Sequence, residues 1–567
     1  MNTLKVANSN DFHWTNINWL NIENYVSKLQ QQIFLAETQN NRRKVKKLQR
    51  TLIHSKANIL LSIRKVTQIT TSKRLSGIDN YKVLTDKERY KLFNQLIHFN
   101  IKKLHPLKPF INLNNKIANF NIAKDRIIQY MIFHAIEPQY DVHFEPNTYG
   151  FRTGRSIFDA IGSIYNKVGP KKKRKWIYKI NIKDCFNINK QFLIDNIDCA
   201  YKDILIKWID SNYINENPYH KMNTPQGRII TPILTNILLH GLEKLLGIQY
   251  KKHVQINHGP AFVRYADEIF IFLYEKDDIN ELLPKLEQFF SIRGINFNKA
   301  EKQLVHIKDG FNIKDFNIRV YEDKNPNNIN EKLLITPSKE FVQQIRDKLK
   351  NIFLQCKGRP IKVVLEMINP VVIKTAYYLR TIVSSPTFKK LDYYIDYKLY
   401  QHLKRLHPNK GWKWIKQKYY KKVDNGWQIV DPVSNIKRRC FRDIPIKRHV
   451  LISFNNSVYD PSLKDYWIKR NIYLFRMKNG EARTKLALRQ RFTCPHCLRS
   501  LANGESLELN YILPKKFNGK YEYSNMQLMH TVCLSEHLHE HKTYDDYKNY
   551  VNEQKQWYDK LWKGINS

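Results

Sequence analysis

The stretch FVRYADEIFIF, residues 262–272, limits the fold of this chain more than any other part of the sequence. Its length and its almost continuous apolar and aromatic character predict a buried strand or hairpin rather than an amphipathic helix. Two acidic residues, Asp267 and Glu268, lie inside the run. Because a buried carboxylate is costly unless a cation compensates it, the fold must bring positive charge to these two side chains.

The charge of the whole chain predicts a polyanionic partner. There are 96 Lys and Arg against 51 Asp and Glu, a formal net charge of +45, and 13% of the residues are aromatic. Basic side chains interleaved with aromatic ones suit phosphate contacts and base stacking, so we expect a nucleic acid. The sequence has no apolar run long enough to span a bilayer and does not start like a secretory signal or a transit peptide. We therefore expect no membrane partner.

The 567 residues are enough for several modules, since single cores stop growing at about 250–300 residues. Apolar residues at helical spacing predict two amphipathic helices over residues 18–66. Residues 335–430 are expected to be helical and rich in lysine and aromatic residues. Four cysteines, Cys185, Cys199, Cys356 and Cys440, are scattered and are expected to be reduced.

The remaining three cysteines have the paired spacing of a structural metal site. Cys494-x-x-Cys497 is followed by His530-x-x-Cys533, which predicts a tetrahedral Zn²⁺ site. His537 is an alternative fourth ligand to His530. We otherwise expect the local cluster of His537, His539 and His541 to lie on a solvated helix face.

Several motifs in a fixed order resemble the reverse transcriptases encoded by group II introns. Three resemble palm and fingers motifs, two the maturase or thumb domain, one the DNA-binding segment and the last an HNH endonuclease unit. In chain order they are FEPNTYGFRTGRS (144–156), TPQGRIITPILTNILLH (224–240), RYADE (264–268), INPVVIKTAYYLR (368–380), LHPNKGWKWIKQKYY (406–420), HVLISFNNSVYDPSLKDYWIKRN (449–471) and CPHC…YILPKKFNGK…SNMQLMHTVC (494–533).

The resemblance implies an α+β protein with a right-hand reverse transcriptase fold. Fingers and palm would be followed by a helical thumb or maturase domain, a basic DNA-binding linker and a small ββα-type HNH zinc module. The expected boundaries are 1–80 for a basic helical N-terminal extension, 81–325 for fingers and palm, 326–430 for the thumb, 431–485 for the linker and 486–567 for the zinc module.

The resemblance also implies that the polymerase site is degenerate. Polymerases of this family hold two Mg²⁺ ions with aspartates from two palm strands. Asp267 matches one of them and Glu268 replaces another with its charge kept, but Asn181 in INIKDCFNI stands where the family has a metal-binding Asp. Asn offers one neutral oxygen, and the nearby Asp184 should point to the opposite face of the strand. We expect the positions Asn181, Asp267 and Glu268 to bind Mg²⁺ only if the polymerase is active.

Three further departures from the family pattern agree with this expectation. Asn187 stands at a later acidic position, Ala118 lies near the place of a fingers Arg, and Lys314-Asp315 replaces a Leu-Gly turn near the primer.

The nuclease is also expected to be lost. Asn510 and Tyr511 replace the family's His pair, and Leu534 replaces the His that follows the last cysteine. Neither Tyr nor Leu can act as a general base near neutral pH. Asn525 remains as a residual HNH position, which we expect to be a turn residue. Zn²⁺ held by Cys494, Cys497, His530 and Cys533 would then be purely structural.

Residues expected to contact RNA or template are basic, aromatic or part of the matched motifs. They are Arg126, Arg152, Arg155, Gln226, Gly227, Trp412, Lys413, Trp414, Lys416, Lys418 and Tyr419. The first five could equally serve the fold. The segment WKWIKQKYYKK (412–422) could also be an ordinary amphipathic helix, and we expect it to combine both roles, with lysines toward phosphate.

These considerations favour a group II intron maturase that binds its host intron RNA and promotes splicing. The alternatives are an active RNA-directed DNA polymerase and endonuclease that supports intron mobility, and a decayed reading frame. A DNA target and a homodimer are further partners that the resemblance allows. An AT-rich coding sequence, inferred from the heavy use of Asn, Ile, Lys and Tyr, predicts organelle encoding in a plastid, with a mitochondrion or a bacterial cytoplasm as alternatives.

Overall fold

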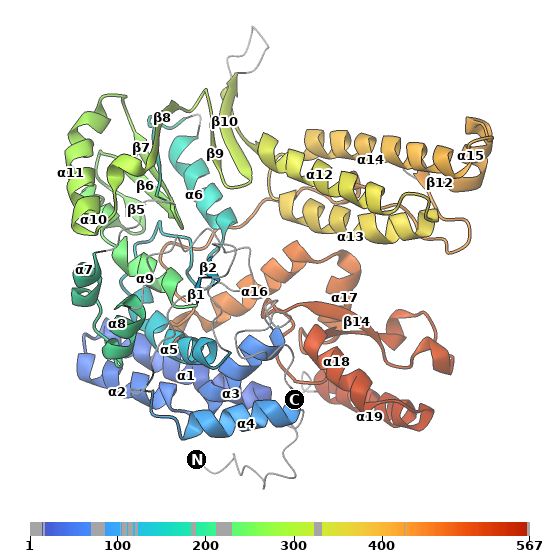
Figure 1. Cartoon of the computed structure of the whole chain (residues 1–567), viewed down its shortest axis with the longest axis horizontal. Helices are drawn as coiled ribbons and strands as arrows, with labels where there is room; N and C mark the ends of the chain where they lie inside the picture. Colours follow the sequence, from blue (N-terminus) through green and yellow to red (C-terminus); the bar gives the residue numbers. More distant parts are fainter. Residues whose placement is uncertain are drawn as a thin grey trace.

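The computed structural model shows an α+β architecture in which a small palm sheet is surrounded by helices, with a long helical arm on one side (Figure 1). The structure describes residues 14, 17–69, 85–101, 104, 110–111, 117–118, 123–169, 171–182, 189–210, 229–322, 331–423 and 426–563.

The N-terminal region forms three helices where two were predicted. They are α1 (Trp19–Thr38), α2 (Arg42–Ile53) and α3 (Lys56–Arg64). The second predicted helix is interrupted because Ser55 caps a new one, its hydroxyl accepting a hydrogen bond from the Asn58 N–H at 3.2 Å. A π-helical turn, Lys65–Ile69, follows α3. These helices pack against α5 (Ala123–Asp141), and α4 (Asp86–Ile97) packs on α3.

The palm is a four-stranded antiparallel sheet in the order β6-β7-β3-β8. Its strands are β3 (Trp176–Asn181), β6 (Ala261–Tyr265), β7 (Glu268–Leu273) and β8 (Glu301–His306). The stretch 262–272 is therefore a hairpin, one of the two predicted forms, and its turn is made at Ala266 with a positive φ of 57°.

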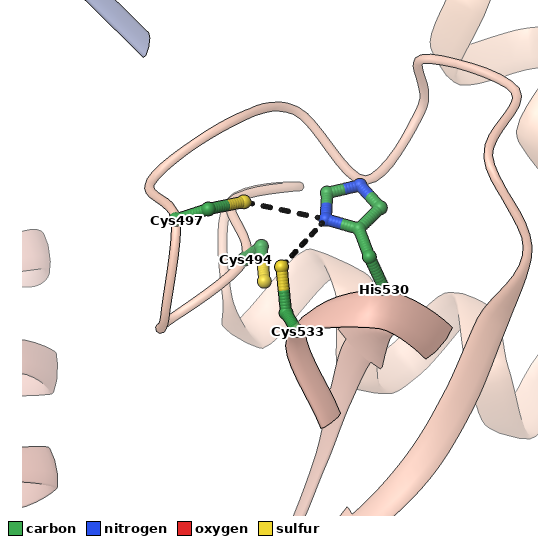
Figure 2. Close-up of side chains that lie close together, drawn as sticks. All are labelled: Cys494, Cys497, His530 and Cys533. Carbon is green, nitrogen blue, oxygen red and sulfur yellow. Dashed lines mark hydrogen bonds between the residues drawn. The ribbon is translucent and has the colours of Figure 1, made fainter. Parts of the chain in front are cut away.

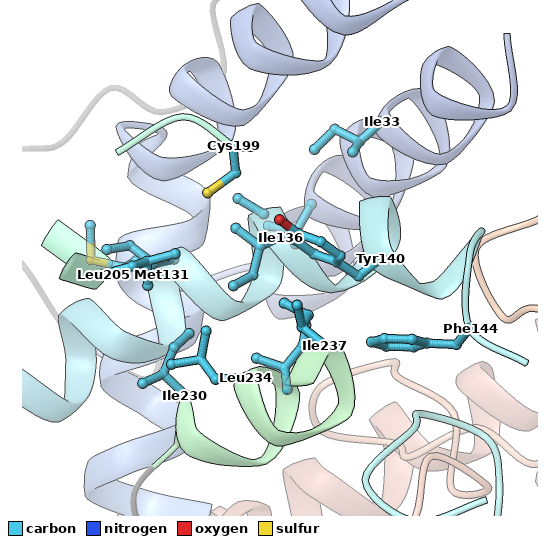
Figure 3. Close-up of a cluster of buried hydrophobic side chains, with 14 of the residues drawn as sticks. Ile33, Met131, Ile136, Tyr140, Phe144, Cys199, Leu205, Ile230, Leu234 and Ile237 are labelled. Atoms are coloured by element: carbon cyan, nitrogen blue, oxygen red, sulfur yellow. The ribbon is translucent and has the colours of Figure 1, made fainter. Parts of the chain in front are cut away.

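Both faces of the central strand β7 are buried, which explains the continuous apolar run. Because side chains alternate along a strand, Ile269 and Ile271 enter one hydrophobic core, while Phe270 and Phe272 enter a second. The first core includes α5 and α9 (Thr231–Leu238) and reaches the N-terminal helices (Figure 3). The second core continues into the helical arm.

The remaining elements of the fingers and palm are short apart from two helices. They are β1 (Phe110–Ile111), β2 (Ile117–Ala118), α6 (Ile157–Val168), α7 (Lys190–Asp195), α8 (Lys202–Asp210), α10 (Leu242–Leu245), β4 (Tyr250–Lys251), β5 (Val254–Gln255), α11 (Asp278–Ile292), β9 (Phe311–Ile313), β10 (Phe316–Glu322) and β11 (Glu331–Pro337). The last three strands form a second antiparallel sheet that leads into the helical arm.

The helical arm consists of α12 (Lys339–Gln355), α13 (Ile361–Leu379), α14 (Ser385–Leu406) and α15 (Trp412–Tyr419). The helical prediction for this region is wrong at its end, where β12 (Tyr420–Val423) and β13 (Gly426–Ile429) form a hairpin. The hairpin is stable there because residues 420 and 429 lie opposite each other and extend the arm's core, with Tyr420 and Ile429 packed into it.

The C-terminal part contains α16 (Lys464–Lys478) and α17 (Glu481–Arg489), followed by β14 (Leu507–Tyr511), β15 (Met526–His530), α18 (Thr531–Glu540) and α19 (Tyr544–Lys563). The hairpin β14–β15 followed directly by α18 is the predicted ββα unit. None of the helices in the described ranges combines the length and the apolar character that crossing a membrane would require.

Candidate functional site

The two palm carboxylates are held by lysine ammonium groups. The side chains of Asp267 and Glu268 are only 2% and 8% exposed. Nζ of Lys314 lies 2.8 Å from Oδ1 of Asp267 and 3.9 Å from Oε2 of Glu268. Nζ of Lys179 lies 3.1 Å from Oε1 of Glu268. Two positive charges therefore compensate the two negative ones.

Local geometry explains why both lysines reach this point. In the β3–β7 pairing Asn181 lies opposite Glu268, so Lys179, two residues earlier, shares a face of the sheet with Glu268. Lys314 sits at the turn between β9 and β10 with a φ of 46°, and its backbone N–H donates to Oε2 of Glu268 at 3.2 Å. Burial by itself lowers the pKa of Lys314, but Glu268 and Asp267 outweigh burial and raise it, so the ammonium stays charged.

Asn181 occupies the end of β3, between Glu268 and Glu301 in the sheet register. Its amide donates from Nδ2 to Oε2 of Glu301 at 3.0 Å. Asp184 and Asn187, the other acidic or formerly acidic positions considered, lie outside the described residues. The palm residues that are described therefore present two neutralised carboxylates and an amide.

This arrangement does not fit a pair of Mg²⁺ ions. Mg²⁺ requires hard oxygen ligands in near-octahedral geometry, usually with carboxylates free to face it. Here each turn carboxylate already binds an ammonium group. Within the described ranges, one group of three or more His, Cys, Asp or Glu side chains lies close enough to share a metal ion, and it is in the C-terminal part.

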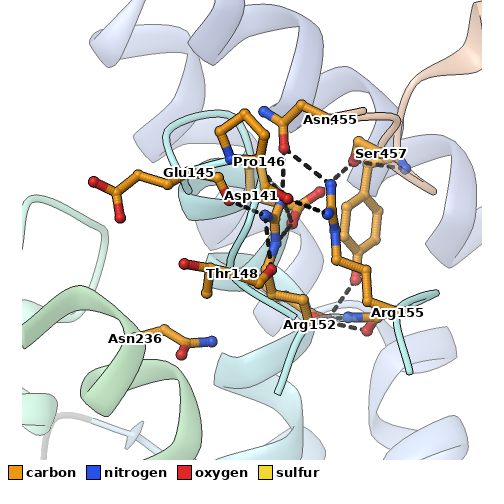
Figure 4. A network of polar contacts seen from close by, with 12 residues as sticks. Asp141, Glu145, Pro146, Thr148, Arg152, Arg155, Asn236, Asn455 and Ser457 are labelled. Atoms are coloured by element: carbon orange, nitrogen blue, oxygen red, sulfur yellow. Dashed lines mark hydrogen bonds and ion pairs between the residues drawn. The ribbon is translucent and has the colours of Figure 1, made fainter. Parts of the chain in front are cut away.

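Arg152 and Arg155 are occupied within the protein (Figure 4). Nε of Arg152 donates to Oδ1 of Asp141 at 2.9 Å, and its Nη2 donates to Oδ1 of Asn455 at 3.1 Å. Nη2 of Arg155 donates to the same Asn455 oxygen at 3.0 Å and to the carbonyl of Phe454 at 3.1 Å. In this arrangement the two arginines fasten the linker segment 449–471 to the fingers.

The other motif residues of the fingers and palm that were expected to contact template are Arg126, Gln226 and Gly227. Arg126 lies on α5. Gln226 and Gly227 lie outside the described residues.

Of the four scattered cysteines, Cys185 lies outside the described residues. Cys199, Cys356 and Cys440 are buried free thiols, as expected.

The end of the helical arm carries an exposed basic and aromatic surface. Trp412 is 47% exposed, and Lys413 and Lys418 on the same helix are exposed. Nζ of Lys416 lies 4.2 Å from the ring centroid of Trp427, which is 53% exposed. Trp427 was not predicted, because residues 335–430 were expected to be helical and Trp427 lies on a strand, β13, that folds back onto α15. We call these five side chains the arm-tip surface.

Trp414 and Tyr419 contribute to packing instead. The ring of Trp414 lies 4.8 Å from that of His407, and Tyr419 is buried. The hydroxyl of Tyr419 is 2.7 Å from Nε2 of His407. The segment thus combines an inward aromatic side with an outward lysine-rich side, as predicted.

The four predicted metal ligands converge (Figure 2). The ligand atoms of Cys494, Cys497, His530 and Cys533 all lie within 4.8 Å of one another. Nδ1 of His530 is 3.4 Å from Sγ of Cys497 and 3.9 Å from Sγ of Cys533. A tetrahedral ion with metal–sulfur bonds of about 2.3 Å separates its ligands by about 3.5–3.8 Å. Nε2 of His530 donates to the carbonyl of Ser500 at 3.3 Å, which leaves Nδ1 free to bind a metal.

The cluster decides between the two candidate histidines in favour of His530. The expectation that His537 is solvated is wrong, because it is fully buried, with its ring centroid 4.3 Å from those of His541 and Tyr550. It lies one helical turn after Cys533 on the inward face of α18. Burial, followed by the charges of His541 and His496, lowers the pKa of His537 to about 3, so its ring is neutral.

The residual nuclease positions have structural surroundings. Asn510 is buried on β14 opposite Gln527, Tyr511 ends that strand, and Leu534 is buried on α18. Asn525 accepts a hydrogen bond from the Leu513 N–H at 2.8 Å and donates to the Leu513 carbonyl at 2.9 Å. Asn525 therefore closes a turn, as expected.

Two buried aspartates that attach the linker were not found in the sequence. Asp159 on α6 accepts from Nη2 of Arg470 at 2.6 Å and lies 3.0 Å from Nε2 of His449. Asp392 on α14 accepts from Nη2 of Arg438 at 3.0 Å. Burial alone would raise the pKa of Asp159, but its basic and hydroxyl partners lower it to about 2. The sequence signal that could have revealed both aspartates is an acidic residue on the otherwise apolar face of an amphipathic helix.

Comparison with known families divides the chain into three matched parts. Residues 14–96 match the N-terminal domain of reverse transcriptase. Residues 115–329 match the reverse transcriptase (RNA-dependent DNA polymerase) family. Residues 342–420 match the maturase-specific domain of group II introns.

Curated relatives carry related names. Maturase-like protein 1 of Euglena longa is 25% identical over 355 residues, which is 59% of this chain and 72% of the relative. Its counterpart in Euglena gracilis is 24% identical and covers 54% of this chain and 66% of the relative. The group II intron-encoded protein LtrA of Lactococcus lactis subsp. cremoris is 34% identical over 155 residues, 26% of this chain and 24% of LtrA.

Proposed function

We propose that this chain, which belongs to the group II intron-encoded proteins that combine a reverse transcriptase domain with a maturase-specific domain, acts as a maturase: it binds its host intron RNA and promotes splicing. The maturase-specific match over residues 342–420 and the two maturase-like relatives support this role.

The observation that carries the proposal is the ion-paired palm turn. Lys314 and Lys179 take the place beside Asp267 and Glu268 that a metal-binding palm leaves to cations from solution. Asn181 adds no charge. The palm then serves as a rigid body that holds the other modules, and splicing chemistry is left to the RNA.

The mechanism requires preferential binding of the folded intron. A protein shifts an RNA folding equilibrium by the difference between its affinities for the folded and unfolded states. Structured RNA is recognised by shape, backbone and exposed loops. The arm-tip surface offers lysines for phosphates and two exposed tryptophan rings, Trp412 and Trp427, for unpaired bases.

Attachment of the linker makes this surface rigid relative to the palm. Asp392 binds the linker at α14, while Asp159 and Arg152 bind it at the fingers and palm. RNA segments bound at the arm tip and near the palm are then held at a fixed separation, which lowers the entropy cost of bringing them together.

Finer assignments belong to the same proposal. The ion at Cys494, Cys497, His530 and Cys533 is Zn²⁺ in a structural role, because three thiolates and one imidazole suit its tetrahedral coordination. The five-part division of the chain, the HNH origin of its last part and encoding in a plastid are retained as expected from the sequence. A DNA target and a homodimer are not needed for the maturase role.

The test is a splicing assay with the full chain and its host intron transcript at an Mg²⁺ concentration where the RNA alone splices slowly. We expect the protein to accelerate splicing and to bind the folded intron more tightly than an antisense transcript of equal length. A double variant, Trp412→Ala with Trp427→Ala, should lose acceleration while keeping its circular dichroism spectrum. Equal affinity for both transcripts with no acceleration would overturn the proposal.

A further inference from the structure

A buried arginine lies between the N-terminal helices and the metal cluster. Arg64 ends α3 and is 1% exposed. Its guanidinium carbon lies 4.4 Å from the ring centroid of Trp19, and its Nη2 lies 4.0 Å from Sγ of Cys533. Among the described residues, its Nε and Nη1 have no hydrogen-bond partner.

A buried guanidinium requires negative charge and hydrogen-bond acceptors, and the neighbouring carboxylates direct their hydrogen bonds to another arginine. Glu505 interacts electrostatically with Arg64, but its carboxylate is bound to Arg499. Arg499 also binds Glu23 of α1. Arg64 thus has negative charge nearby, but within the described part of the chain no carboxylate receives its N–H groups. A buried N–H group without an acceptor is costly, so the sulfur atom beside Arg64 becomes important.

With a metal bound, the cluster would provide that negatively charged acceptor. Cysteines bind metal ions as thiolates. Three thiolates around one divalent ion leave one net negative charge, spread over sulfur atoms that accept N–H hydrogen bonds. Sγ of Cys533 is the atom of the cluster that faces Nη2 of Arg64.

Arg64 lies within an extensive contact between distant parts of the chain. Trp19, Ile63 and Val66 belong to the same hydrophobic core as Cys494 and Cys533. At the edge of this contact, Nε2 of Gln68 donates to Oε1 of Glu536 at 3.0 Å. Figure 1 shows the blue helices α3 and α4 next to the red helix α18. The metal cluster is thus placed against the N-terminal helices, with Arg64 between them.

We propose that metal binding at the cluster and docking of the C-terminal unit onto the N-terminal helices are coupled through Arg64. The metal–thiolate centre acts as a clasp between residues 19–69 and residues 490–540. The bound metal supplies the anion that Arg64 needs, and Arg64 stabilises the thiolate charge. This role uses no nuclease chemistry and does not depend on the maturase proposal.

The first test uses Co²⁺ as the probe, because its thiolate charge-transfer absorption reports directly on the cysteine sulfurs. The full reduced chain is compared with Arg64→Met, Arg64→Lys and the exposed control Arg43→Met. Partners that orient or stabilise metal ligands change metal affinity by about 10–100-fold. We expect Arg64→Met to lose affinity in that range and to shift the charge-transfer band, Arg64→Lys to retain most of the affinity, and Arg43→Met to match the natural chain.

The second test needs no variant and therefore does not depend on whether Arg64→Met folds. Metal is removed from the natural chain with a chelator, and hydrogen–deuterium exchange is followed. Amides of α1 and α3 should exchange faster together with those of α18, while α14 in the helical arm stays unchanged. The proposal would be overturned if exchange in α1 and α3 stayed unchanged after metal removal. It would also be overturned if a folded Arg64→Met protein bound Co²⁺ as tightly as the unsubstituted chain.

Discussion

Replacing Lys314 with methionine should loosen the palm turn. Methionine keeps the apolar stem and removes the ammonium group that lies 2.8 Å from Asp267. The side chain of Asp267 is 2% exposed, so its charge would remain buried without this partner. Breaking a buried ion pair typically costs about 3–5 kcal/mol. Because the Lys314 side chain is 37% exposed, solvent screening reduces this to about 2–3 kcal/mol.

Hydrogen–deuterium exchange measures this loss locally, which suits a chain of several modules better than a global unfolding curve. At 1.36 kcal/mol per tenfold change, 2–3 kcal/mol corresponds to about 30–150-fold faster exchange of the β6, β7 and β9 amides. Lys308→Met is the matched control, since Lys308 precedes β9 and pairs with Glu322 in solvent. The control should leave palm exchange unchanged.

Two further outcomes decide the interpretation. A second substitution, Asp267→Leu, should restore much of the protection lost in Lys314→Met, because both partners of the pair are then replaced by apolar groups. In the natural chain, millimolar Mg²⁺ should not alter exchange at the turn. Unchanged exchange in Lys314→Met, or strong protection of the natural turn by Mg²⁺, would refute the view that lysine compensates these carboxylates.

Three other predictions concern the linker and the arm tip. The folded pKa of Asp159, about 2, lies below its ordinary value of 3.8, so its ionised form contributes about 2 kcal/mol of stability above pH 4, and this contribution is lost as the pH falls toward 2. Pepsin should therefore cut residues 449–471 near pH 2 but not at pH 4, and cleavage at pH 4 would contradict this. Arg438→Met should cost about 3–5 kcal/mol, measured as faster hydrogen–deuterium exchange of the amides of α14, which carries Asp392, whereas a similar loss in the exposed control Arg439→Met would refute the buried pair. Lys416→Gln should lower the salt dependence of RNA binding by about one ion, and Trp427→Ala should weaken binding by about 1–3 kcal/mol; filter binding with unchanged values would remove the arm tip from the RNA surface.

Local patterns predicted the parts of the fold that depend on neighbouring residues. The apolar run at 262–272 identified the palm hairpin because burial on both faces leaves no polar alternation. The paired cysteine spacing located the metal cluster because each pair of ligands lies on one short segment, Cys494 and Cys497 at a turn and His530 and Cys533 where β15 meets α18. The break at Ser55 was missed, since the apolar spacing continues across it and only a serine cap marks the new helix.

Contacts between distant residues could not be predicted in the same way. The sequence showed that Lys314-Asp315 replaces Leu-Gly. It did not show that the lysine reaches Asp267, 47 positions away, because this contact depends on how β9 and β10 dock on the sheet. Arg152 and Asn455 are 303 positions apart. For His537 a local signal existed: it stands four residues after Cys533, which places both on one helical face.

The most direct measurement of the central claim is primer extension on an RNA template with Mg²⁺, run beside splicing of the host intron with the same protein preparation. The ion-paired palm predicts that the natural chain makes no cDNA while it accelerates splicing. Robust cDNA synthesis by the natural chain would contradict the account, because Asp267 and Glu268 would then have to release their lysines to bind metal ions.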